Sequence, residues 1–116
     1  MTLASELQAY QVEFRTKAPA DALTVMAKAT GDLAASGIVD RSLKVGDVLP
    51  VVTLPNAKGE LFSMADALAK GPVVIAFYRG GWCPYCNMEL HALQQVLPEI
   101  EAAGATLIAI SPETPD

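Results

Sequence analysis

Residues 73–86 read Val73-Val-Ile-Ala-Phe-Tyr-Arg-Gly-Gly-Trp-Cys-Pro-Tyr-Cys86, and this stretch is the clearest indication of the fold. It begins with an unbroken β-branched and aromatic run, Val73 to Tyr78, which is typical of a strand covered on both faces. Cys83 and Cys86 follow, and Pro84 between them suits the first position of a helix. The stretch therefore predicts a central strand that turns through two glycines into a helix with both cysteines at its start.

The residues that follow complete a strand–helix–strand unit. We expect the helix to run from about Pro84 to Ala103, interrupted at Pro98, and to end at Gly104. The run Thr106-Leu-Ile-Ala-Ile110 then predicts a second buried strand. Two strands joined through a helix form a right-handed parallel crossover by default, so this part of the chain is of the α/β class.

A β-hairpin and a short helix are expected before the central strand. The segments 51–54 and 60–63 predict two short strands, and Pro55-Asn-Ala-Lys-Gly59 predicts the turn between them. A short helical turn follows at about Ala65 to Ala69.

Residues 1–40 differ from the rest because their apolar residues recur at helical spacing. One helix is predicted from Leu3 to Lys17, and a second begins after Pro19 and ends at Gly37. The apolar stripe consists of Leu3, Leu7, Tyr10, Phe14, Leu23, Met26 and Leu33. We therefore predict an N-terminal helical hairpin arm at residues 1–40 and an α/β domain at residues 41–116.

Composition and charge exclude several classes of protein. The 116 residues are 52% hydrophobic, which excludes a disordered chain. The net charge of −5 argues against nucleic acid as a partner. The N-terminus lacks a basic segment followed by an apolar one, and the longest apolar run, Val73 to Tyr78, is far too short to span a membrane. We therefore expect a cytoplasmic protein without a membrane partner.

The cysteine pair is the candidate site for chemistry. A thiolate at a helix N-terminus faces free backbone N–H groups and the positive end of the helix dipole, which lower a cysteine pKa. The spacing of Cys83 and Cys86 brings the second sulfur within one helical turn of the first, so a reversible disulfide can form. Trp82 can shield one side of the sulfurs. Redox use of the pair is the favoured interpretation.

Two other interpretations of the cysteines remain open. Both can be small apolar side chains in a core, which is a common role for cysteine. A zinc site would need further ligands, of which His91 is the only nearby candidate. His91 lies five residues beyond Cys86 and about 140° around the helix, so we interpret it as a surface histidine and expect no metal.

Four segments resemble the alkyl hydroperoxide reductase and thiol-specific antioxidant family, in its peroxiredoxin-like branch. They are Val45-Gly-Asp-Val-Leu-Pro50, the turn sequence Leu54-Pro-Asn-Ala-Lys-Gly59, Phe77-Tyr-Arg-Gly-Gly-Trp-Cys-Pro-Tyr-Cys-Asn-Met-Glu-Leu90, and Ala109-Ile-Ser-Pro-Glu-Thr114. The resemblance implies a thioredoxin-like fold over residues 41–116. It also implies two further strands and a helix, so we expect this chain to be truncated after the second core strand.

The family register implies roles for single residues. In that register Cys86 is the peroxide-attacking cysteine and Glu89 follows at the family's distance, whereas Cys83 and Arg79 replace a family threonine and proline. Comparison with thioredoxins instead implies that Cys83, as the more exposed sulfur, is the nucleophile and that Cys86 resolves the mixed disulfide. Trp82, Pro84, Tyr85 and Arg79 support the pair, Arg79 as a nearby cation or as a solvent-facing strand end.

We therefore predict an enzyme that reduces hydroperoxides through a Cys83/Cys86 dithiol–disulfide cycle, with a thioredoxin- or glutathione-type thiol as reductant and no cofactor. Protein disulfide exchange is one alternative, and a catalytically inactive fragment that acts as an interaction module is another. The open edge of the central strand and the apolar stripe of the arm predict a homodimer or a larger homo-oligomer.

Overall fold

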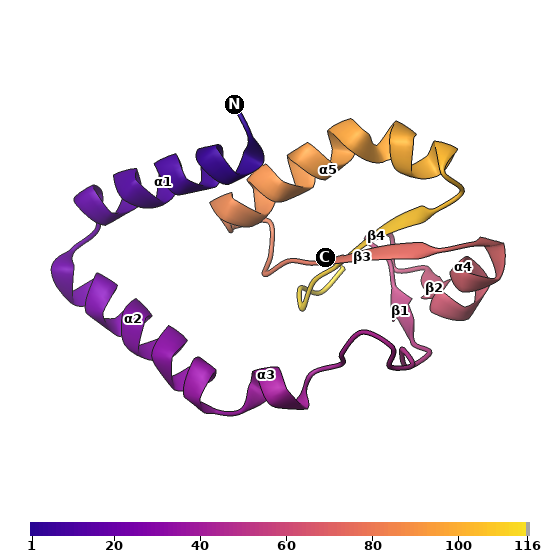
Figure 1. Cartoon of the computed structure of the whole chain (residues 1–116), viewed down its shortest axis with the longest axis horizontal. Helices are drawn as coiled ribbons and strands as arrows, with labels where there is room; N and C mark the ends of the chain where they lie inside the picture. Colours follow the sequence, from indigo (N-terminus) through magenta and orange to yellow (C-terminus); the bar gives the residue numbers. More distant parts are fainter. Residues whose placement is uncertain (116) are drawn as a thin grey trace. The chain divides into compact units, whose positions relative to one another are not determined.

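The computed structural model describes residues 1–115, which form two compact units (Figure 1). The predicted boundary lies after residue 40, whereas one compact unit is Ala4–Pro50 and the other begins again at Val51 and also includes Met1–Leu3. Asp116, with which the predicted α/β domain ends, lies outside the described residues. No helix within residues 1–115 has the length and apolar character that crossing a membrane requires.

The first unit is helical, as predicted. Helix α1 spans Leu3–Lys17 and helix α2 spans Ala20–Ala35, so both predicted helices are confirmed. Gly37 follows α2 with φ 80°, a left-handed conformation that glycine adopts without steric strain, and this turn ends the helix. A short helix that the sequence did not reveal, α3 at Ile38–Arg41, comes directly afterwards.

The prediction that the two helices pack against each other as a hairpin is wrong. Among the described residues, α1 and α2 do not pack against each other along their lengths. Neither helix contains a buried residue, and Met26 and Leu33 of the apolar stripe are 47% and 56% exposed. The physical reason lies at Pro19: the Ala18 N–H donates to Phe14 O, and the Leu23 N–H already donates to Pro19 O. Only Ala18 and Pro19 therefore lie between the two helices, and this link is at the short limit of those that reverse the chain between packed helices.

The second unit begins with the predicted β-hairpin. Strands β1, Thr53–Pro55, and β2, Leu61–Ser63, pair antiparallel, and the side-chain oxygen of Asn56 accepts the Lys58 and Glu60 N–H groups within the turn. Helix α4, Met64–Lys70, follows directly, with its N-cap side chain Ser63 accepting the Asp66 N–H. This helix buries Met64 and Ala67, which supply much of the small core.

The predicted crossover is confirmed in the remaining elements. Strand β3, Val73–Phe77, and strand β4, Thr106–Ile110, pair in parallel, and helix α5, Pro84–Ala102, connects them (Figure 1). Helix α5 continues across Pro98. Because neighbouring parallel strands end at the same edge, the segments after β3 and after β4 lie close together.

The expectation that β3 is a central strand covered on both faces is not met. Within residues 1–115 its only strand partner is β4, and Val74 and Phe77 are 42% and 73% exposed. The run of apolar residues indicated a covered strand, but coverage depends on neighbours that the run itself does not specify.

Candidate active site

The cysteine pair lies where β3 turns into α5. Cys83 is the N-cap residue of α5 and Pro84 occupies its first turn, where the missing N–H of proline removes no helical hydrogen bond. The Cys83 N–H donates to Gly80 O at 3.1 Å, and the Cys83 carbonyl accepts the Asn87 N–H at 3.0 Å. The backbone around Cys83 is therefore held on both sides, and Cys86 follows in the first turn of the helix.

The two sulfurs differ in exposure, and in the direction opposite to the one predicted. Cys83 is fully buried, at 0% exposure, whereas Cys86 is half-buried. The prediction of a more exposed Cys83 is therefore wrong. Position at the helix end predicted exposure, but the sulfur lies against the Arg79 side chain, with the guanidinium Nη2 3.0 Å from Cys83 Sγ.

Arg79 contacts both cysteines. Its guanidinium donates to Cys83 Sγ at 3.0 Å, and its backbone N–H donates to Cys86 Sγ at 3.4 Å. The guanidinium carbon also lies 5.0 Å from the centre of the Trp82 ring, within the range of a cation–π contact. Arg79 is thus a cation close to the pair, and it is also exposed just beyond the end of β3.

These contacts favour the charged form of Cys83. Burial raises the pKa of the Cys83 thiol, but the side chain and backbone N–H of Cys86 and the guanidinium of Arg79 lower it, and the net result is a pKa of about 7. The contact with Cys83 also raises the pKa of Arg79, so the guanidinium stays charged. The thiolate of Cys83 therefore forms more readily near neutral pH than that of an ordinary cysteine.

The other predicted site residues differ in their exposure and in their contacts. Trp82 is 66% exposed, and its ring lies against Arg79. Tyr85 is half-buried, and Glu89 is exposed one helical turn beyond Cys86. His91 is exposed and its Nε2 lies 3.4 Å from the Gln95 side-chain nitrogen. Within residues 1–115, no three His, Cys, Asp or Glu side chains are grouped closely enough to hold a metal ion.

Sequence reasoning missed two residues that hold the Gly80–Gly81 segment. The Gly81 N–H donates to Glu113 Oε1 at 2.6 Å, and the Asn87 side-chain N–H donates to Gly81 O at 2.9 Å. Glu113 follows β4, so it is far away in sequence but close in space. The signal that points to it is the parallel pairing of β3 and β4, which brings the segments after both strands to one edge of the sheet.

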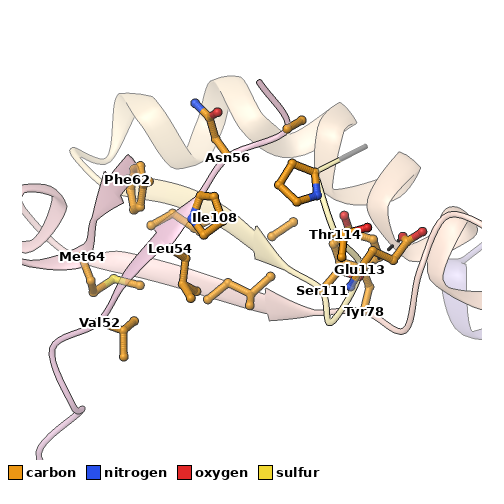
Figure 2. A pocket seen from close by; sticks show the side chains of 15 residues that line it. Val52, Leu54, Asn56, Phe62, Met64, Tyr78, Ile108, Ser111, Glu113 and Thr114 are labelled. Carbon is orange, nitrogen blue, oxygen red and sulfur yellow. Dashed lines mark hydrogen bonds between the residues drawn. The ribbon is translucent and has the colours of Figure 1, made fainter. Parts of the chain in front are cut away.

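A pocket of about 460 Å³ adjoins this edge, between the β1–β2 hairpin and the end of β4. Figure 2 shows its apolar side chains, including Leu54 and Phe62, toward one end and Tyr78, Ser111 and Glu113 together at the other. Glu113 therefore belongs both to the pocket wall and to the contacts that hold the segment before Cys83.

Comparison with known proteins identifies the family. A sequence profile of the AhpC/TSA family matches residues 45–116. Peroxiredoxin Bcp of Escherichia coli strain K12 is 30% identical over 74 residues, which cover 64% of this chain and 47% of the relative. Peroxiredoxin bcp1 of Schizosaccharomyces pombe is 30% identical over 76 residues, 66% of this chain and 39% of the relative.

The chain spans about half the length of the curated bacterial relatives it matches. The matched part includes β3, both cysteines and β4. The chain therefore belongs to the AhpC/TSA family, whose members have a thioredoxin-like fold.

Proposed function

We propose that this chain is a peroxiredoxin-like, thiol-dependent peroxidase that reduces hydroperoxides through a dithiol–disulfide cycle of Cys83 and Cys86. The observation that supports the proposal most directly is that Arg79 contacts both sulfurs, at 3.0 Å and 3.4 Å. A cation beside a thiol favours the thiolate, which is the form that attacks an O–O bond. Membership of the AhpC/TSA family and the similarity to peroxiredoxin Bcp support the same activity.

Cys86 is the proposed attacking sulfur. It is the more accessible of the two, and it stands where the family register has the attacking cysteine. The buried Cys83 thiolate takes the proton of the Cys86 thiol, with which it interacts directly.

The cycle has three balanced steps. The Cys86 thiolate attacks the hydroperoxide, the O–O bond breaks, Cys86 becomes a sulfenic acid, and the departing alkoxide takes a proton from solvent to leave as an alcohol. The Cys83 thiol then attacks the sulfenic sulfur, which releases water and forms the Cys83–Cys86 disulfide. An external thiol donor finally supplies two electrons and two protons, and both thiols are restored.

The surrounding residues have supporting roles in this proposal. Arg79 supplies positive charge, and Trp82 holds the guanidinium through its ring face. Pro84 starts the helix between the cysteines, while Tyr85 and Glu89 flank Cys86 on α5. We propose a thioredoxin- or glutathione-type thiol as the reductant and the cytoplasm as the compartment, since such donors keep cysteine pairs reduced there.

A homodimer or larger homo-oligomer is part of the same proposal. Phe77 of β3 is 73% exposed, and β4 is the only strand paired with β3 among residues 1–115. Strands with an unpaired apolar edge favour pairing with another chain. Light scattering during size-exclusion chromatography tests this part, and a monomer at micromolar concentration would contradict it.

The activity is tested by thiol counting. Reduced protein is mixed with one equivalent of hydroperoxide, free thiols are counted, and mass spectrometry locates the oxidised sulfurs. We expect both thiols to disappear with formation of an intramolecular disulfide. In Cys83→Ser the sulfenic acid should persist on Cys86 and be trapped by dimedone, whereas Cys86→Ser should consume no peroxide. Survival of both thiols in the native protein would refute the peroxidase proposal.

Protein disulfide exchange is the second candidate function. The observation in its favour is the pKa of about 7 at Cys83, which suits an attacking thiol at neutral pH. In that case Cys86→Ser should accumulate a mixed disulfide at Cys83, because the resolving thiol is gone. Oxidation of the pair by a disulfide substrate but not by hydroperoxide would favour this function over the first.

A further inference from the structure

The Gly80–Gly81 segment is held by contacts from two directions. Glu113 Oε1, from the segment after β4, accepts the Gly81 N–H at 2.6 Å. Asn87, from the first turns of α5, donates its side-chain N–H to the Gly81 carbonyl at 2.9 Å. Both backbone polar groups of Gly81 are thus bound by side chains, and a segment built from two glycines is fixed in one conformation despite their conformational freedom.

Glu113 is itself held in place. Its backbone N–H donates to Ser111 Oγ at 3.1 Å, and the same hydroxyl lies 3.5 Å from Glu113 Oε1. The turn after β4 therefore directs the carboxylate toward the end of β3. Figure 2 shows Ser111 and Glu113 side by side at one end of the pocket.

The contacts continue from Glu113 to the sulfurs. A Cβ atom placed on Gly80 would lie 2.9 Å from Glu113 Cδ and 2.4 Å from Trp82 Nε1, so both side chains pack closely on this glycine. The Trp82 ring in turn lies 5.0 Å from the Arg79 guanidinium carbon. Arg79 reaches Cys83 Sγ at 3.0 Å. A continuous set of contacts thus joins a residue after β4 to the buried sulfur.

We propose that Glu113 is a positioning residue for the cysteine site: its carboxylate fixes the Gly80–Gly81 segment, and through it the Trp82–Arg79 pair that lies against Cys83. Glu113 touches neither sulfur in this arrangement and takes no part in bond making. The inference rests on the proposed function only in treating Cys83 and Cys86 as the reacting pair.

The test measures the site without peroxide, so its failure can be distinguished from failure of the peroxidase proposal. Glu113→Ala removes the acceptor of the Gly81 N–H, and Glu113→Gln keeps an oxygen that can accept it. Iodoacetamide labelling followed by peptide mass spectrometry reports the rate at Cys83 alone. Each rate at neutral pH is divided by the rate of the same variant at high pH, where the thiol is fully ionised, so that a change in the exposure of the sulfur cancels. Glu101→Gln, an exposed change near the far end of α5, is the matched control.

We expect Glu113→Ala to slow labelling of Cys83 about threefold, because a displaced Arg79 stabilises the thiolate less well. Glu113→Gln should restore a rate close to that of the native protein, and Glu101→Gln should not change it. The single Trp of the chain gives a second signal: acrylamide should quench Trp82 fluorescence more strongly in Glu113→Ala than in Glu113→Gln.

Two results would overturn the inference. One is a native labelling rate and native quenching in a folded Glu113→Ala protein. The other is a Glu113→Gln protein that behaves like Glu113→Ala, since that would show that the hydrogen bond is not what positions the site. Circular dichroism checks folding, and if Glu113→Ala does not fold, Glu113→Ser offers a polar side chain that is too short to reach Gly81.

Discussion

The helical unit of residues 4–50 and the sulfur-bearing unit from Val51 onward are stabilised by contacts of different range. In the first, hydrogen bonds and ion pairs join residues a few positions apart, as in Lys28 with Asp32, and α1 and α2 bury no residue. In the second, each residue of β3 pairs with a residue of β4 that lies 33 positions further along the chain, and Glu113 binds Gly81 from 32 positions away. All fully buried apolar residues of the described chain, Met64, Ala67 and Cys83, lie in this second unit.

This contrast shows which kind of contacts a reactive site requires. Helices form from local spacing alone, but a buried sulfur with a lowered pKa needs groups from separate segments brought together and held. Four experiments test this contrast, beginning with the largest expected effect.

Amide hydrogen exchange should separate the two units most strongly. We expect amides in β3 and β4 to exchange about 100-fold more slowly than those in α1, because opening the parallel pair breaks long-range contacts and opening α1 breaks only local ones. Mass spectrometry of peptides covering each element measures the rates. Equal protection of α1 and β3 amides would contradict the expected difference between the two units.

Removal of Arg79 should change the reactivity of Cys83. The pKa of this thiol is about 7, held there in part by the guanidinium. Arg79→Ala should raise the pKa by about one unit, so labelling of Cys83 at neutral pH falls about fivefold and recovers only as the pH rises. The pKa of Cys83 rises because the guanidinium that is removed had favoured the thiolate.

Labelling with iodoacetamide across a range of pH gives the midpoint for Cys83. Arg15→Ala, an exposed substitution in the last turn of α1, is the control and should leave the midpoint unchanged. An unchanged midpoint in Arg79→Ala would show that the observed contact does not tune the sulfur.

Two glycine-to-alanine substitutions should have opposite effects on the free energy of unfolding. Gly31 lies within α2 with open space around a new Cβ, so Gly31→Ala should stabilise the protein by about 0.5–1 kcal/mol. A Cβ on Gly80 would meet the Trp82 and Glu113 side chains, and the φ of 158° is a conformation that L residues rarely adopt, so Gly80→Ala should destabilise the protein by about 2 kcal/mol.

Urea unfolding measures both glycine variants. Destabilisation by Gly31→Ala, or a neutral effect of Gly80→Ala with unchanged Trp82 fluorescence, would contradict the contrast between an open helix and a closely packed site.

Loss of a local ion pair should have the smallest effect. Lys28 and Asp32 are 2.7 Å apart, but their side chains are 76% and 66% exposed. Lys28→Ala should therefore change the free energy of unfolding by less than about 0.5 kcal/mol. A larger loss in thermal or urea unfolding would mean that exposed pairs carry more of the stability of the helical unit than their geometry indicates.

Most of the secondary structure could be predicted from local patterns in the chain. Helices α1 and α2, the β1–β2 hairpin, and the strand–helix–strand unit all occur where spacing, proline and glycine predicted them. The same local signals placed Cys83 and Pro84 at the start of α5. These features depend on residues within a few positions of one another, and that is the range over which periodicity and capping act.

The way in which those elements pack could not be predicted from local patterns. The predicted hairpin of α1 and α2 is not packed, and Cys83, which lies against the Arg79 guanidinium, is the buried sulfur of the pair. The sequence also did not predict the contacts of Glu113 and Asn87 with Gly81. Burial and long-range hydrogen bonds depend on which segments the fold brings together, and no local pattern in the chain specifies that.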